Sequence, residues 1–288
     1  MISDQELLNQ FESNIGAPVE VRKIEQPETA AAVYAQTHCG FISGSNVAEI
    51  CSYQPEIGEI EKLETEIEEL THKILSSTTG KTKTASDARE TKQRQLYRLT
   101  SGELPSGAVK FCEELAMLRI TGYCEQSDVD FRSKECAWGV SNEPLAVDAL
   151  TAYYSDIRAT KEQQAFIKLH DFDRVGCTPD GVIYYDGDAW MTMDIKCPFN
   201  RRIHGIDNRN VQSFAQFKRN NSCYYWQFTL QMLCAGVDKH LFASFDPRFP
   251  ADKQLIMHTF EIVKSDSDFM LSRINAAEKL IAKIISEF

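Results

Sequence analysis

The chain has 288 residues, of which 43% are hydrophobic, and this is enough to bury one full core. Its formal net charge of −11 would ordinarily count against a nucleic-acid partner, because phosphate binding relies on Lys and Arg. No apolar run approaches the roughly 18 residues that a membrane-spanning helix needs, and the N-terminal residues lack the features of a secretory signal, so we expect a cytoplasmic globular protein that does not enter the membrane.

The N-terminal part of the chain predicts a short strand at residues 19–26 and a helix at residues 43–52. Residues 54–100 then change in composition and predict a helical hairpin inserted into a single domain that spans residues 1–288. The first helix of this hairpin carries its apolar side chains at spacings of three and four, at Ile57, Ile60, Leu63, Ile67, Leu70 and Ile74. A polar linker separates it from a second helix at about residues 87–99. Nothing in the hairpin is typical of a catalytic site.

Three further helices are predicted, at residues 107–121, 135–154 and 267–288. The last of these presents one apolar face, which fits either core packing or an oligomer contact. Nine cysteines are scattered along the chain without a CxxC pair, so we expect buried thiols and neither a disulfide framework nor a zinc site.

Residues 175–196 alternate in the manner of strands around a DGD turn, and they hold the most informative residues. Successive side chains of a strand point to opposite faces, so Asp194 and Lys196 share one face while Ile195 points into the core. A hairpin would bring Asp180 beside this pair. Two carboxylates and the main-chain carbonyl of Ile195 make an oxygen-rich site suited to Mg²⁺ or Mn²⁺, with a lysine that can orient a water molecule.

These residues fit the hydrolysis of a phosphodiester bond, which needs a hard cation and an activated water. The alternative from the residues alone is that Asp180 is a turn residue, while Asp194 and Lys196 form a surface ion pair, since short motifs often match by chance. A local basic stretch favours phosphate binding within an otherwise acidic chain. It runs from residue 196 to residue 219 and comprises Lys196, Arg201, Arg202, Arg209, Lys218 and Arg219, against the single acid Asp207.

Five segments together carry a family resemblance, namely AWGVSNEPLAVDAL, VGCTPDGVIYY, MDIKCPF, YYWQFTLQMLCAG and FDPRF. In these segments the chain resembles the lambda-exonuclease (YqaJ-type) family of PD-(D/E)xK nucleases, from about residue 16 to residue 264 with the insertion excepted. The resemblance implies an α/β fold, with a central mixed sheet flanked by helices. It also implies a metal-dependent deoxyribonuclease, a phage-type recombination exonuclease with two divalent ions in each active site.

Carried over residue by residue, the resemblance implies that Glu143, Asp180 and Asp194 bind the metal ions and that Lys196 orients the water. Asp194 stands where the family usually has Glu, which shortens the reach by one methylene group. Gln227 matches the family's glutamine near the catalytic lysine. Taken alone, Glu143 is a solvated helix acid and Gln227 an amide at the edge of the core, so both roles depend on the resemblance.

The family digests duplex DNA from a 5′ end and leaves a 3′ single strand, which the resemblance implies for this chain. Ser45 matches a hydroxyl of the family's pocket for the 5′-phosphate, near the start of a helix that would also favour an anion. Arg201 and Arg202 follow the KCPF segment, and the fork of Arg202 suits phosphate. His38 stands where the family has arginine, which makes phosphate binding weaker or dependent on pH.

The resemblance further implies a ring-shaped homotrimer, a single-strand annealing protein as partner, and a phage or prophage gene expressed in a bacterial cell. Two other functions stay open: an endonuclease or structure-specific nuclease of the same fold, and a non-catalytic DNA-binding assembly protein. An iron–sulfur nuclease would need a cysteine cluster, which the spacing of Cys223 and Cys234 does not supply.

Overall fold

The computed structural model describes residues 39–51, 58–77, 82–100, 102–122, 134–154, 156–158 and 166–288. The chain divides into two compact units. One comprises residues up to Ala48 together with Leu115–Ser267, and the other comprises Glu49–Glu114 together with Asp268–Phe288. The strand predicted at residues 19–26 lies outside the described residues. Within the described ranges, no helix is long and apolar enough to cross a membrane.

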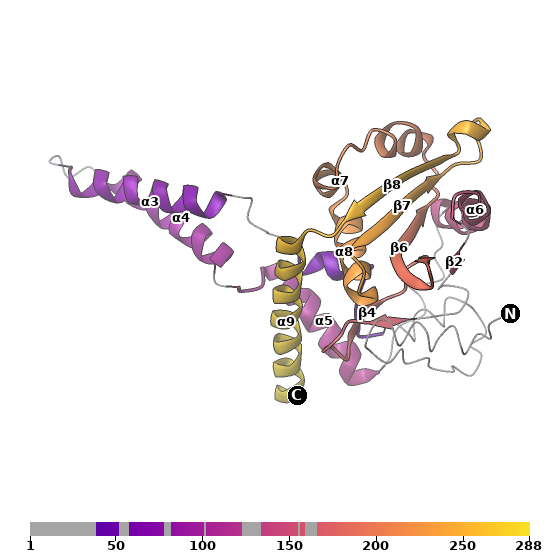
Figure 1. Ribbon diagram of the computed structural model, residues 1–288. Coiled ribbons are helices and arrows are strands. Elements are labelled where there is room, and N and C mark those ends of the chain that lie inside the picture. Colours follow the sequence, from indigo (N-terminus) through magenta and orange to yellow (C-terminus); the bar gives the residue numbers. More distant parts are fainter. Residues whose placement is uncertain are drawn as a thin grey trace. The chain divides into compact units, whose positions relative to one another are not determined.

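The first unit is built on a five-stranded mixed sheet (Figure 1). Its strands, in spatial order, are β2 (Ile157–Arg158), β5 (Gly181–Tyr185), β6 (Asp188–Lys196), β7 (Lys239–Phe245) and β8 (Leu255–Glu261). β6 and β7 run parallel, and the other neighbours pair antiparallel. The predicted hairpin is therefore present as β5 and β6, and it places the DIK segment at the end of a central strand.

A second sheet of three strands comes from segments on either side of the hairpin insertion. β1 (Ile42–Ser43) pairs parallel with β4 (Val175–Cys177), which pairs antiparallel with β3 (Ile167–Lys168). β4 and β5 are separated by only three residues, yet they belong to different sheets. Pro179 lies in this break, and because proline has no N–H to donate, it interrupts strand pairing at that point.

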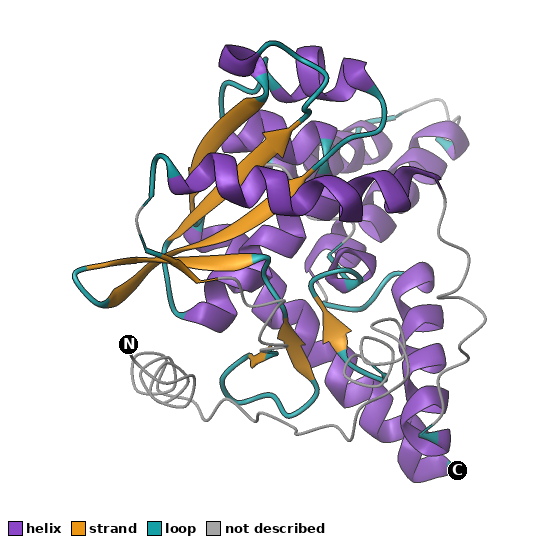
Figure 2. Ribbon diagram, turned by 90° about the vertical axis from the view of Figure 1, so that its right-hand side faces the viewer, coloured by secondary structure: helices purple, strands orange, loops and turns teal. Residues whose placement is uncertain are grey.

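Helices cover both faces of the five-stranded sheet. α6 (Lys134–Thr151) packs its buried Ala146 and Leu150 against Met191, Met193 and Ile195 of β6. In Figure 2 this face is turned to the viewer, and the helix crosses the strands. α8 (Ser222–Ala235) lies against the opposite face, toward which the alternate residues of β6 point. The fold class expected from the sequence, a mixed sheet flanked by helices, is confirmed.

Short elements connect these layers. They are η3, a π-helix at Ile203–Asn208, α7 (Phe214–Asn220), and η4 (Ala251–Lys253). The helix predicted at residues 43–52 is wrong in extent, because within the described residues 43–51 only the three-residue 3₁₀ helix η1 (Val47–Glu49) forms. The side chain of Asn46 accepts a hydrogen bond from the Ser43 N–H and donates one to the Phe41 carbonyl, so this segment is held as a turn.

The second unit contains the predicted helical hairpin, formed by α3 (Glu59–Leu75) and α4 (Lys83–Thr100). The two helices lie side by side (Figure 1) and are joined by an ion pair between Lys92 and Glu66. α5 (Ser106–Thr121) and α9 (Lys264–Glu287) contribute residues to both units. On α9 the fully buried side chains recur at the spacing of one helix face, at Met270, Ile274, Ala277 and Ile281.

Candidate active site

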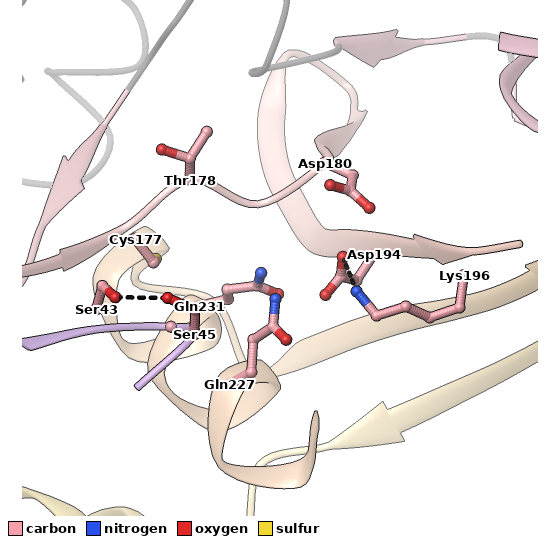
Figure 3. Close-up of a pocket in the computed structure, with 10 residues that line it drawn as sticks. Ser43, Ser45, Cys177, Thr178, Asp180, Asp194, Lys196, Gln227 and Gln231 are labelled. Carbon is pink, nitrogen blue, oxygen red and sulfur yellow. Dashed lines mark hydrogen bonds and ion pairs between the residues drawn. The ribbon is translucent and has the colours of Figure 1, made fainter. Parts of the chain in front are cut away.

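One cavity of about 170 Å³ brings together five of the residues that the sequence singles out, namely Ser45, Asp180, Asp194, Lys196 and Gln227 (Figure 3). Its lining comprises Ser43, Gly44, Ser45, Cys177, Thr178, Asp180, Asp194, Lys196, Gln227 and Gln231. These residues come from the end of β1 and the turn after it, the end of β4 and the break before β5, the end of β6, and one face of α8. The cavity therefore lies where both sheets of this unit meet α8.

Asp180 is held in place by the backbone of the neighbouring strand. It is 8% exposed, and its Oδ2 accepts a hydrogen bond of 2.6 Å from the N–H of Ile195. This bond extends the hairpin register, in which Gly181 lies opposite Met193. The break at Pro179 thus allows Asp180 to turn its side chain toward the end of β6 instead of continuing β4.

Asp194 is almost completely buried, with 1% of its surface exposed. Its Oδ1 accepts a hydrogen bond of 3.0 Å from Lys196 Nζ, whereas its Oδ2 has no hydrogen-bond partner among the described residues. Burial and the nearby charge of Asp180 raise the pKa of Asp194 well above its usual range. The ionised carboxylate is therefore costly at this position unless a further positive charge or donor reaches Oδ2.

Lys196 faces both carboxylates and an aromatic ring. Its Nζ lies 4.9 Å from the centre of the Tyr224 ring, on α8. Burial alone would lower the pKa of Lys196, but attraction by Asp194 and Asp180 outweighs it and raises the pKa. Lys196 is therefore a cation and a hydrogen-bond donor in this site, which favours an orienting role over proton abstraction.

Hydroxyl groups line the other end of the cavity. Ser43 and Ser45 lie with their Oγ atoms 2.9 Å apart, and Thr178 contributes a third hydroxyl from the break after β4. Gly44 lets this turn approach α8, since a Cβ at that position would lie 3.3 Å from Cγ of Gln227. His38, the other residue that the sequence assigned to this end, lies outside the described residues.

Two glutamines enter the cavity from α8. Gln227 and Gln231 are four residues apart, so they lie on the same helix face. Sequence reasoning found Gln227 through its motif but missed Gln231, and it also missed Ser43 and Thr178. The spacing of four is the signal that could have found Gln231.

Four of the described residues predicted for the site do not line this cavity. One is Ile195, whose carbonyl was a predicted metal ligand and whose side chain packs in the core with Ala146 and Leu150 of α6. Glu143 is half-buried on α6. Burial, together with the negative charges of Glu143 and Asp180, raises the pKa of the Cys197 thiol to about 12. Arg201 and Arg202 are exposed at the start of η3, where Arg202 Nη1 pairs with Asp207 at 2.9 Å. Glu143 is therefore near the residue that follows Lys196, whereas both arginines lie outside the cavity.

Arg248, in the FDPRF segment, fixes the chain just beyond Lys196. Its Nε and Nη2 donate to both oxygens of the buried Asp246, at 2.8 and 2.7 Å. Nη2 also donates to the carbonyl of Phe199 at 2.9 Å, and the guanidinium lies 4.2 Å from the centre of the Trp138 ring on α6. Burial alone would raise the pKa of Asp246, but the hydrogen bonds from Arg248 outweigh it and lower the pKa. One side chain thus joins the ends of β6 and β7 to α6.

The number of oxygen, nitrogen and sulfur ligands in the cavity determines how well it could bind a metal ion. The part of the chain that the structure describes contains no group of three or more His, Cys, Asp or Glu side chains that could hold a metal ion. The cavity does contain two buried carboxylates, of which one has an oxygen without a partner. This set is smaller than the one predicted, because Glu143 and Ile195 are outside the cavity lining.

The fold is that of an α/β protein with a mixed sheet flanked by helices, and the DIK segment ends a central strand of this sheet. Residues 33–238 match the family described as the YqaJ-like viral recombinase domain, so the chain belongs to this family. The resemblance drawn from the sequence motifs is thereby confirmed. No curated protein matches the chain.

Solved structures of one bacterial enzyme share the fold. The alkaline exonuclease LHK-Exo of Laribacter hongkongensis is similar with a TM-score of 0.55 and 16% identity, over 89% of this chain and 94% of that chain. The complex of LHK-Exo with dAMP is similar with a TM-score of 0.55 and 15% identity, over 88% and 93% of the respective chains. At 15% and 16% identity, these structures show that the fold is shared.

Proposed function

We propose that this protein is a metal-dependent exonuclease that digests duplex DNA from a 5′ end and leaves a 3′ single-stranded tail. The observation that carries the proposal is the convergence of Asp180, Asp194 and Lys196 on one cavity at the end of a central strand. The polarity of digestion follows from the family resemblance and is supported by the hydroxyl-lined end of the cavity.

The cavity fits a hard divalent cation. Asp194 Oδ2 is buried without a partner, and the burial of two neighbouring carboxylates is unfavourable unless a positive charge compensates them. Carboxylate and carbonyl oxygens are the ligands that Mg²⁺ and Mn²⁺ prefer. Asp180 and Asp194, which line the cavity, would hold the ion. The Ile195 carbonyl is proposed as a further ligand from its place between Asp194 and Lys196 in the sequence. Glu143 as a further ligand, and a second ion, are proposed from the resemblance.

Each side chain of the cavity then has its own role in the hydrolysis of the phosphodiester bond. A bound divalent cation would polarise the scissile phosphate and lower the pKa of the attacking water. Lys196, protonated and fixed by Asp194, donates a hydrogen bond that orients the water and offsets negative charge on the phosphate. Gln227, on the adjoining helix, positions the reacting groups. The leaving oxygen takes up a proton from solvent.

Hydroxyl donors suit the phosphate at the DNA end, because most protein contacts to phosphate oxygens come from such groups and from cations. Ser45 would bind it together with the neighbouring Ser43 and Thr178. His38, Arg201 and Arg202 are proposed as additional phosphate contacts on the resemblance. A homotrimer, a single-strand annealing partner and action in the cytoplasm of a bacterial host are proposed on the same ground.

The test is the digestion of linear duplex DNA labelled at one 5′ end, with and without a 5′-phosphate, in Mg²⁺ or Mn²⁺, beside a closed circular control. We expect loss of label from the 5′ end, faster with the phosphate, while the circle stays intact. Cutting of the circle would identify an endonuclease instead. No cutting in either metal would contradict an enzyme and favour a DNA-binding assembly protein.

Variants of the strand end make this test specific. Asp180→Asn and Lys196→Met should each lower the rate at least about a hundredfold, because each removes a group that acts on the transition state. Asp188→Asn is the matched control, since Asp188 is an exposed aspartate at the other end of β6. It should digest DNA at the parent rate. Parent-like activity of either site variant would exclude this cavity as the active site.

A further inference from the structure

A second buried oxygen in the cavity lacks a partner. Gln231 is 1% exposed, and its Oε1 has no hydrogen-bond partner among the described residues. Its side chain lines the same cavity as Asp180 and Asp194, into which the amide extends from α8 (Figure 3). Buried polar groups in folded proteins almost always have a partner, so this oxygen indicates a group that binds in the cavity.

The chemistry of that group follows from what the cavity leaves unsatisfied. Gln231 Oε1 and Asp194 Oδ2 are both hydrogen-bond acceptors. Lys196, the cation of the cavity lining, already donates to the other oxygen of Asp194. An anionic or apolar group would leave both acceptors without a donor. A cation that keeps its water molecules would satisfy them, since it attracts the carboxylate and its waters donate hydrogen bonds.

We propose that Gln231 is a cation-positioning residue, whose Oε1 accepts a hydrogen bond from a water molecule bound to the divalent ion at Asp180 and Asp194. Mg²⁺ usually keeps several waters in protein sites, and those waters need acceptors. This inference rests on the proposed function. It also separates the two glutamines of α8: Gln227 acts on the reacting groups, whereas Gln231, one helical turn further on, acts on the hydrated ion.

The experiment measures Mn²⁺ binding to the protein without DNA, from the electron paramagnetic resonance signal of free Mn²⁺. Gln231→Met keeps the length and apolar stem of the side chain and removes the acceptor. It should weaken Mn²⁺ binding about 10- to 100-fold, the usual range for a group that supports a metal ligand. Gln231→Glu keeps an acceptor and adds negative charge, so it should bind Mn²⁺ at least as tightly as the parent.

Thr229→Val is the matched control. Thr229 lies on the same helix with the same 1% exposure, but its hydroxyl already donates to the Tyr225 carbonyl at 2.9 Å. Its replacement should leave Mn²⁺ affinity unchanged even if the protein becomes less stable. Parent-like Mn²⁺ binding by Gln231→Met, or equal weakening by the Met and Glu variants, would overturn the role of Gln231.

Two results separate this inference from the proposed function. If the parent protein and Asp194→Asn both fail to bind Mn²⁺, the metal site itself is wrong, and the inference falls with it. If the parent binds Mn²⁺, Asp194→Asn does not, and Gln231→Met binds like the parent, the site stands and only Gln231 loses its assignment.

Discussion

Arg248 lies where three segments beside the candidate site meet, and its replacement tests how that region is held together. Arg248→Met keeps an unbranched apolar side chain and removes the guanidinium that lies over Trp138, which leaves Asp246 fully buried without its cationic partner. Breaking a buried ion pair in this way costs about 3–5 kcal/mol, and the lost stacking on Trp138 adds about 0.5–1 kcal/mol. We expect a loss of about 4 kcal/mol in the free energy of unfolding at pH 7.

A urea titration monitored by tryptophan fluorescence measures the loss in the free energy of unfolding. Urea avoids the ionic screening that guanidinium chloride would add. Arg202→Met is the matched control, because Arg202 pairs with Asp207 at 2.9 Å but both side chains are largely exposed, at 67% and 40%. Such a pair contributes at most about 1 kcal/mol. If the two variants lose the same free energy of unfolding, or Arg248→Met loses less than about 1 kcal/mol, the ion pair between Arg248 and Asp246 is not a determinant of stability.

Three further outcomes follow from the described geometry. The pKa of Asp246 is lowered in the folded protein, so its ionised carboxylate stabilises the fold above the ordinary pKa of 3.8, and this contribution is lost as pH falls through the folded pKa. The stability lost in Arg248→Met should therefore become smaller in acid. Urea titrations of the parent and the variant at stepwise lower pH measure this change. Mn²⁺ at a hundredfold excess over its dissociation constant should stabilise the parent by about 2.7 kcal/mol in thermal melting and leave Asp194→Asn unchanged; an equal response of both would place the ion elsewhere. Gly176→Ala should unfold at clearly lower urea, since the new Cβ would lie 2.5 Å from the Ile167 carbonyl oxygen, and a parent-like midpoint would mean that β3 and β4 can separate freely.

Much of the strand geometry could be predicted because alternation is a local property. The period of two along β6 separates Asp194 and Lys196 from Ile195 without any knowledge of the rest of the fold. The same reasoning led to the β5–β6 hairpin and to Asp180 beside it. The stripe of apolar residues on α3 likewise predicted the helical hairpin, although α4 begins at Lys83 and not near residue 87.

The remaining parts of the site depend on contacts between distant segments. Ser43 and Thr178 reach the cavity because β1 pairs with β4. No local sequence pattern predicts a pairing between strands of two or three residues. The position of Glu143 relative to the cavity depends on how α6 packs on the sheet, which a motif does not specify. The turn at residues 43–46 replaced an expected helix because the Asn46 side chain accepts from the Ser43 N–H and donates to the Phe41 carbonyl.

The β5–β6 hairpin has a practical consequence for handling the protein. Its tip, Asp186–Gly187, adopts positive φ angles and is exposed, and the register shifts between Ile183 and Tyr184. From Asp188 to Lys196 the strand covers about 26 Å, at roughly 3.3 Å for each residue. The tip is therefore an attachment point for a dye or a surface tether in single-molecule measurements, since it lies at the opposite end of β6 from the candidate site.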